Sequence, residues 1–164
     1  MILTLIIDCV WGAYLKEDCI WVIEIDEKAC LYDLHDVIQD AVKFGRDHPF
    51  EFFLANSSSP GTKKQWLTEK DEWEDKEDDF CRIQLMEIWP TGRKKLYYLF
   101  DFGDKWTFEI RKERGGKEPE PGVKYPRLIK AIGPNPEQYP RFGEWMRKWP
   151  LMESSGRLLT AANF

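Results

Sequence analysis

Apolar residues alternate with polar ones, or form short blocks, along most of the first 110 residues. Segments 2–10 and 19–25 are short and rich in β-branched side chains, a pattern that is typical of strands. Gly12 and a charged stretch at residues 16–18 separate them, so we expect an N-terminal β-hairpin. A block of aromatic and aliphatic residues predicts a third strand at residues 50–55.

A helical pattern lies between residues 33 and 44, where apolar side chains recur on one face of an α-helix. These side chains are Leu34, Val37, Ile38, Ala41 and Val42. Asp33 and Asp36 stand in or near the first turn, where acidic groups suit the helix dipole. Gly45 follows the last apolar residue and is a natural residue for ending the helix. We therefore predict one amphipathic helix.

The most regular pattern lies between residues 97 and 110, where aromatic residues occupy every second position. It predicts a second hairpin with residues 103–105 as its loop and Gly103 in the left-handed conformation. The expected cross-strand pairs are Phe102 with Trp106, Phe100 with Phe108, and Tyr98 with Ile110. Such pairs stabilise a sheet and fix its register, so we expect these rings to build core.

Other segments carry weaker patterns. Residues 69–79 contain eight acidic side chains, which resist burial, so we expect a surface loop or a frayed helix there. Residues 80–89 fit either a strand or a short helix. A loop is predicted at residues 112–124, a final strand at residues 125–132, and a short helix at residues 137–149.

The length of 164 residues fits one domain, which we place at residues 1–150, with a tail at residues 151–164. The net charge of −5 is a poor match for a phosphate backbone. Basic residues interleave with aromatic ones in the C-terminal half, however, so nucleic-acid binding stays an alternative. No stretch approaches the ~20 apolar residues of a membrane helix, and the first residues indicate a strand rather than a signal peptide. We expect a cytoplasmic protein.

The four cysteines are not spaced as C-x-x-C, and the chain has two histidines, so we expect neither a zinc site nor a cofactor. Reduced cysteines in the core are the expected state. An oxidised pair between Cys9 and Cys19, across the first hairpin, is the alternative.

Four polar residues form the candidate site: His35, His48, Asp101 and Asp104. Asp101 and Asp104 stand at the bend of the second hairpin, where two carboxylates hold a cation or accept protons. Alternatively, Asp101 accepts hydrogen bonds from its own turn and Asp104 is a solvated turn residue. Both histidines lie near ends of predicted elements, so either they join Asp101 in a metal site or they bond locally. We assign no metal.

Several separated blocks of the chain occur in the order seen in one protein family. They are residues 31–41 (LYDLHDVIQDA), 48–52 (HPFEF), 98–106 (YLFDFGDKW), 125–126 (YP) and 133–137 (GPNPE). On these blocks the chain resembles the plasmid pRi ORF-3-like family, named from a root-inducing plasmid and also labelled mobile-element passenger or TnpR family. The resemblance covers residues 1–140, about the whole predicted domain.

The resemblance implies an α+β fold with the order strand, strand, helix, strand and then further strands. We therefore predict a β-grasp-like mixed sheet packed on one main helix. The resemblance implies no established activity. Phe108 stands where members usually carry a His, and the segment after Pro134 lacks the family's usual acid, Cys and Gly pair. A site that used those residues would be impaired in this chain.

From these features we predict a non-enzymatic binding or interaction module, with an unknown protein partner favoured and a link to mobile elements or a larger assembly. Trp21 and Trp106 are the candidate binding aromatics. The alternative is a metal-assisted or acid/base enzyme built on His35, His48, Asp101 and Asp104. No convincing set of catalytic residues is evident in the sequence.

Overall fold

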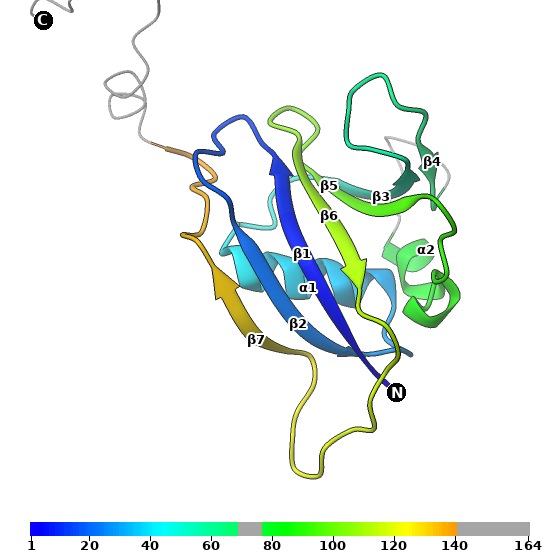
Figure 1. Cartoon of the computed structure of the whole chain (residues 1–164). Helices are drawn as coiled ribbons and strands as arrows, with labels where there is room; N and C mark the ends of the chain where they lie inside the picture. Colours follow the sequence, from blue (N-terminus) through cyan, green and yellow to red (C-terminus); the bar gives the residue numbers. More distant parts are fainter. Residues whose placement is uncertain (69–76, 141–164) are drawn as a thin grey trace, which may run out of the picture.

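A large antiparallel sheet is the main feature of the computed structural model, which describes residues 1–68 and 77–140. Within these residues the sheet has seven strands in the order β4-β3-β5-β6-β1-β2-β7 (Figure 1). The strands are β1 (Ile2–Trp11), β2 (Ile20–Asp26), β3 (Phe50–Ala55), β4 (Gln65–Trp66), β5 (Lys95–Phe100), β6 (Trp106–Lys112) and β7 (Arg127–Ile132). The predicted N-terminal hairpin is confirmed as β1 and β2, and the predicted third strand as β3.

Two short α-helices and one 3₁₀ turn lie on the same side of this sheet: α1 (Leu31–Val42), α2 (Glu77–Arg82) and η1 (Leu85–Glu87). The backbone N–H of Cys30 donates to Asp33 Oδ2 at 2.8 Å, which closes the start of α1. α1 ends two residues earlier than expected, because Lys43 adopts a left-handed conformation (φ 64°) and its N–H bonds to the Gln39 carbonyl.

The predicted fold class, α+β with a β-grasp-like mixed sheet packed on one main helix, is wrong. A mixed sheet needs a parallel pair, whereas every strand pair in the described residues is antiparallel. The sheet dominates the fold, since α1 has 12 residues and α2 has 6. Apolar periodicity identifies strands, but the direction in which strands pair depends on how their connections cross the sheet, which periodicity does not encode.

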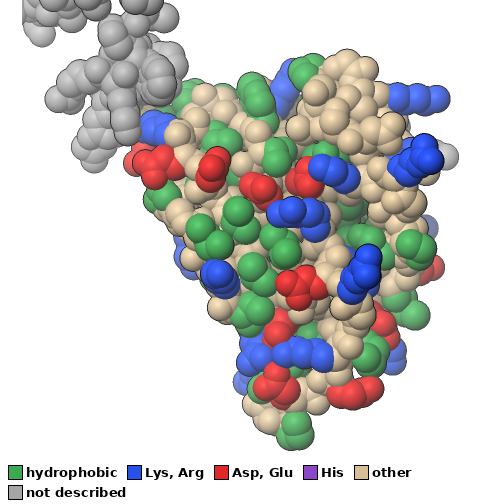
Figure 2. Space-filling model, viewed as in Figure 1, with side chains coloured by type: hydrophobic (Ala, Val, Ile, Leu, Met, Phe, Trp, Pro, Cys, Tyr) green, Lys and Arg blue, Asp and Glu red, His purple; other side chains and the backbone are tan. Residues whose placement is uncertain are grey.

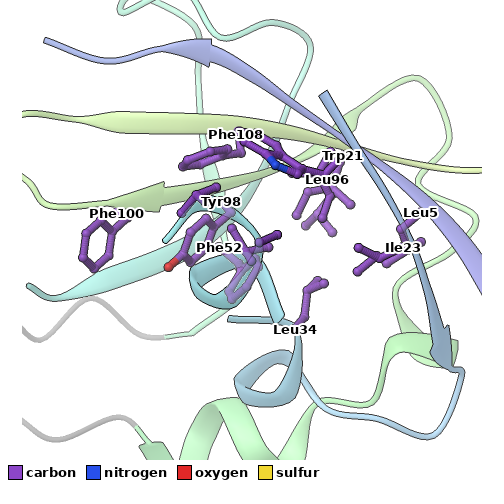
Figure 3. Packing of buried hydrophobic residues seen from close by; sticks show 14 of the residues in the cluster. Leu5, Trp21, Ile23, Leu34, Phe52, Leu96, Tyr98, Phe100 and Phe108 are labelled. Carbon is purple, nitrogen blue, oxygen red and sulfur yellow. The ribbon is translucent and has the colours of Figure 1, made fainter. Parts of the chain in front are cut away.

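The core lies between the sheet and these helices, on what we call the covered face of the sheet. Aromatic side chains of β5 and β6 pack there against aliphatic ones from β1, β2 and α1 (Figure 3). The fully buried members include Leu5, Ile23, Leu34, Phe52, Tyr98, Phe100 and Phe108. Because side chains alternate along a strand, the same strands point their other residues to the opposite face, which we call the open face. Figure 2 shows that face, where hydrophobic side chains mix with charged ones.

The second hairpin forms with the predicted face buried but with a different register. The observed pairs are Phe100 with Trp106, Tyr98 with Phe108, and Leu96 with Ile110. The strand ends at Phe100 because Asp101 turns into the left-handed region (φ 61°), as does Lys105 (φ 53°). Asp101 tolerates this conformation because its carboxylate accepts hydrogen bonds from the backbone N–H groups of Gly103 and Asp104 in the same turn. The expectations of a three-residue loop and of a left-handed Gly103 are therefore wrong.

The remaining segments sort as follows. Residues 80–89 are helical at α2 and η1, and residues 127–132 form β7 as predicted. Residues 69–76 of the acidic segment, and residues 141–149 of the predicted C-terminal helix, lie outside the described residues. All four cysteines are free, so the oxidised alternative for Cys9 and Cys19 is not the state of this structure. Among the described helices, none has the length and apolar character needed to cross a membrane.

Candidate functional site

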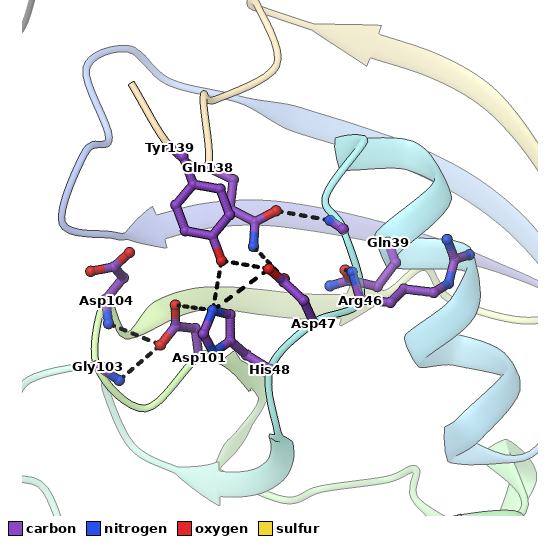
Figure 4. A network of polar contacts seen from close by, with 10 residues as sticks. Gln39, Arg46, Asp47, His48, Asp101, Gly103, Asp104, Gln138 and Tyr139 are labelled. Atoms are coloured by element: carbon purple, nitrogen blue, oxygen red, sulfur yellow. Dashed lines mark hydrogen bonds and ion pairs between the residues drawn. The ribbon is translucent and has the colours of Figure 1, made fainter. Parts of the chain in front are cut away.

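The predicted polar residues do not form one group. His48 Nε2 lies 3.4 Å from Asp101 Oδ2, and the N–H groups of Gly103 and Asp104 donate to Asp101 Oδ1 at 2.9 and 3.2 Å (Figure 4). The structure therefore brings His48, Asp101 and Asp104 to one end of the sheet. His35 lies apart from them in the core, where its ring stacks on Phe50 at 3.7 Å. The arrangement of Asp101 matches the local turn bonding that the sequence left open as the alternative.

His35 belongs to a buried polar trio with Tyr98 and Gln39. Its Nδ1 lies 2.7 Å from the Tyr98 hydroxyl, which also accepts a hydrogen bond from Gln39 Nε2 at 3.0 Å. Burial lowers the pKa of His35 to about 4, so its imidazole is neutral near pH 7. In the neutral ring, Nδ1 accepts a hydrogen bond from the Tyr98 hydroxyl. The three buried side chains thus serve as hydrogen-bond partners for one another. This contact stabilises the attachment of α1 to β5.

His48 joins a second network at the end of the sheet. Its Nε2 lies 2.6 Å from the Tyr139 hydroxyl, which donates to Asp47 Oδ2 at 2.7 Å. Gln138 Nε2 donates to the other Asp47 oxygen at 2.8 Å. The hydrogen bonds from Tyr139 and Gln138 lower the pKa of Asp47, and the same Asp47 contact raises the pKa of Tyr139 to about 12.

These contacts fasten residues 134–139, which we call the C-terminal clasp, to the rest of the fold. The Cys19 thiol donates to the Pro134 carbonyl at 2.8 Å, and the Trp21 indole N–H donates to Asn135 Oδ1 at 3.1 Å. Asn135 in turn donates to the carbonyl of Ala41 in α1 at 3.0 Å. In the described part of the chain, no three His, Cys, Asp or Glu side chains are grouped so as to hold a metal ion. The C-terminal clasp is held against β2 and α1 by its hydrogen bonds with Cys19, Trp21, Asp47 and Ala41.

The two candidate binding aromatics lie in the core. Trp21 is 2% exposed and Trp106 is 0% exposed, so neither ring presents a face to the surface. Trp106 packs edge-on against Phe44 at 5.0 Å and fills the space beside Gly12, where a Cβ would overlap its ring. Its indole N–H has no hydrogen-bond partner among the described residues.

A pocket of about 440 Å³ lies on the open face, and sequence reasoning missed it. Its floor is one row of residues that crosses four neighbouring strands. Glu51 of β3 pairs with Leu99 of β5, Leu99 pairs with Thr107 of β6, and Thr107 pairs with Trp11 of β1. These four residues come from distant parts of the chain and meet only through strand register. We call this feature the open-face pocket.

Aromatic rings form a wall of the open-face pocket at the β3–β4 edge. The rings of Phe53 and Trp66 meet edge-on at 5.2 Å, and both line the cavity. Trp11, which is 50% exposed, lines it from β1. A Trp directly after a predicted strand is the sequence signal that could have indicated this pocket, because large aromatic rings at a surface often mark binding sites.

The β3–β4 and β5–β6 loops lie at the same end of the sheet (Figure 1), and residues of both loops line the pocket. Ser58, Pro60 and Lys64 line it from the β3–β4 loop, and Phe102 and Lys105 from the β5–β6 loop. The left-handed turn at Asp101 directs Phe102 to the pocket instead of the core position that the sequence predicted.

The charged side chains that line the pocket differ in burial: Glu51 is buried, whereas Lys105 is exposed. Glu51 is 3% exposed, and Thr68 Oγ1 donates to its Oε2 at 3.0 Å. The Lys64 ammonium lies 5.5 Å from the centroid of the Phe53 ring, a cation–π contact at the wall. Lys105 is exposed. The pocket thus combines a buried carboxylate, aromatic walls and two cationic side chains, a composition that suits recognition of a small molecule.

Comparison with known proteins gives three findings. A family model described as "Plasmid pRiA4b ORF-3-like protein" matches residues 15–139. A relative from Sinorhizobium fredii, "Uncharacterized protein y4hQ", is 32% identical over 106 residues, which make up 64% of this chain and 50% of that protein. The chain therefore spans about half the length of this curated relative.

The third finding is a solved structure with a similar fold. The crystal structure of protein MM3350 from Methanosarcina mazei, whose title gives its function as unknown, matches with a TM-score of 0.59. The match has 22% sequence identity and covers 79% of this chain and 68% of that one. At this identity the likeness concerns the fold alone.

Proposed function

The chain belongs to the plasmid pRiA4b ORF-3-like family, and from that premise we propose that it is a non-enzymatic binding module whose ligand enters the open-face pocket. The membership confirms the resemblance identified in the sequence. The names of the matched relatives describe no activity, so the proposal rests on the geometry of the site.

The floor of the pocket is the observation that carries the proposal. A row from Glu51 to Trp11 crosses four hydrogen-bonded strands, so the floor is rigid and exists before any ligand arrives. The volume of about 440 Å³ suits a small molecule, because ligand pockets occupy about 300–1,000 Å³. Aromatic walls supply contact area, and a few polar groups supply orientation.

Binding is favoured over catalysis because of how the polar residues are used. The polar atoms at the end of the sheet contact one another or a backbone N–H group of the turn. They belong to Asp47, His48, Asp101 and Tyr139. His35 is neutral and enclosed by Phe50 and Tyr98. These contacts support a structural role for both histidines.

Four expectations from the sequence stay proposals. We keep a cytoplasmic location and a link to mobile elements on the arguments given from the sequence. A protein partner and the nucleic-acid alternative also stay predictions, since the contacts described here concern a ligand of small volume.

Fluorescence titration with 8-anilinonaphthalene-1-sulfonate tests the proposal, because this aromatic probe brightens in apolar pockets. Leu99→Trp fills the floor and should weaken the binding of the probe about tenfold or more. The matched control is Val22→Trp, which places the same indole ring on the same face on β2, outside the pocket lining. Equal probe affinity in Leu99→Trp and the native protein, with both folded by circular dichroism, would overturn the proposal.

A further inference from the structure

We propose that the ligand of the open-face pocket is an aromatic anion, with its ring inside against the aromatic walls and its anionic group at the mouth between Lys64 and Lys105. This inference rests on the proposed function and adds the chemical class of the ligand and its orientation. Carboxylate, phosphate and sulfonate groups share the chemistry that the mouth recognises.

Lys64 and Lys105 both line the open-face pocket, and neither has an acidic partner in the described chain. Lys95 pairs with Glu109 at 3.0 Å on the open face, and the Arg127 guanidinium contacts Glu24 at 2.6 Å. Within residues 1–68 and 77–140, no carboxylate oxygen forms an ion pair with Lys64 or Lys105. The net charge of the chain is −5, which opposes an anion at long range, so the attraction at this cavity comes from the two local lysines.

Lys105 is also held in an uncommon backbone conformation. Its φ of 53° lies in the left-handed region, which is unfavourable for a residue with a side chain. Its N–H bonds to the carbonyl of Asp101 at 2.6 Å, so the turn enforces this conformation. A non-glycine residue held there is a signal of function when its side chain lines a cavity, as that of Lys105 does.

The floor determines the direction in which an aromatic anion lies. At the floor, the buried Glu51 carboxylate accepts a hydrogen bond from Thr68 and has no donor to offer an anionic group, whereas the two lysines that line the pocket attract such a group. The rings of Phe53 and Trp66 give an aromatic body an apolar wall. The Lys64 ammonium already lies beside the Phe53 ring, so it reaches both the ring and the anionic group of a bound ligand.

Two probes with the same aromatic skeleton test the anionic requirement. They are 8-anilinonaphthalene-1-sulfonate and N-phenyl-1-naphthylamine, which lacks the sulfonate. The native protein should bind the sulfonated probe about five- to tenfold more tightly than the neutral probe. The Lys64→Gln/Lys105→Gln variant should bind both probes equally, with an unchanged affinity for the neutral probe. The matched control is Lys124→Gln/Lys130→Gln, which removes the same charge at and beside β7, the opposite edge of the sheet.

The outcomes separate the two proposals. Equal affinity for both probes in the native protein, or a preference for the sulfonate that survives in Lys64→Gln/Lys105→Gln, would refute the anionic ligand and leave the pocket intact as a binding site. Probe binding that Leu99→Trp does not weaken would refute the pocket itself, and with it the orientation argued here. Loss of the preference in the β7 control as well would assign it to overall charge, and would also count against the two lysines.

Discussion

The two faces of the sheet use neighbouring residues of the same strands in different ways. On the covered face, Tyr98 and Phe108 are fully buried among aromatic and aliphatic side chains. The neighbouring residues on the two strands, Leu99 after Tyr98 and Thr107 before Phe108, point the other way and form part of the floor of a cavity. Alternation along a strand therefore lets one hairpin build a core with one set of residues and a candidate binding site with the other.

The treatment of polar groups differs in the same way. His35 and Gln39 in the core, and Asp47 and Tyr139 at the clasp, are satisfied by other residues of the chain. At the open-face pocket, Lys64 and Lys105 have no carboxylate partner in the described part of the chain. Closed networks thus stabilise this fold, whereas the two lysines that we propose contact a ligand lie on the open face.

The largest effect should come from removing an aromatic ring on the covered face. Phe108→Ala deletes a fully buried ring that packs against Trp21 and Tyr98, so we expect a loss of about 3–5 kcal/mol in the free energy of unfolding. Thr107→Ala, on the adjacent open-face position, should cost about 1 kcal/mol or less. Urea denaturation measures both changes. Equal losses of stability would contradict the claim that the covered face contributes more to stability than the open face.

Acid should destabilise the protein through His35. Its folded-state pKa of about 4 lies below its unfolded value, so the unfolded chain binds more protons between pH 4 and 6.5. Stability should be constant above this window and fall by roughly 2–3 kcal/mol as the pH drops from 6.5 to 4.

His35→Asn provides the control for this pH effect. It should be less stable than the native protein near pH 7, because it loses the contacts with Tyr98 and Phe50, and it should lack this part of the slope. Chemical denaturation at several pH values measures the difference. Parallel profiles for the two proteins would show that His35 is not buried in a neutral form.

The hairpin turn should respond to the side chain of Asp101 with a smaller effect. Asp101→Ala removes the acceptor for two backbone N–H groups and places Ala at a positive φ, so we expect a loss of about 2 kcal/mol. Asp101→Asn keeps an acceptor and tolerates the left-handed conformation, so it should retain most of the stability. Thermal unfolding compares the two variants. An equal loss of stability in Asp101→Asn would show that the negative charge of Asp101 beside His48 stabilises the turn more than its hydrogen bonds do.

The smallest effect on stability should come from the pocket lysines. Lys64→Gln/Lys105→Gln changes two side chains without ion pairs in the described residues, so the free energy of unfolding should change by about 0.5 kcal/mol or less. The same protein should lose its preference for the sulfonated probe. A large loss of stability would show that the lysines support the fold instead of a ligand.

Several of these features were predictable from the sequence because they depend on local pattern. Alternation identified β1, β2, β3 and the aromatic hairpin, and the apolar stripe identified α1. The register of the hairpin was not predictable, because it depends on the left-handed turn at Asp101, and the expected Gly103 loop was equally consistent with alternation.

The open-face pocket was unpredictable for a related reason. Glu51, Leu99, Thr107 and Trp11 each look like an ordinary outward-facing strand position, and only the pairing of four strands places them in one row. Trp21 and Trp106 were the candidate binding aromatics from the sequence, whereas the structure places both in the core. The antiparallel order of the whole sheet is likewise a long-range property, which local periodicity does not contain.

The most direct test of the account is a ¹⁹F NMR titration of the protein labelled with 5-fluorotryptophan, using 8-anilinonaphthalene-1-sulfonate as the ligand. Single Trp→Phe variants assign the signals. We predict that the signals of Trp11 and Trp66, on the open face, shift as the probe binds, while those of Trp21 and Trp106, in the core, stay in place. Shifts confined to Trp21 and Trp106, or no response from Trp11 and Trp66 at saturation, would contradict the assignment of binding to the open face.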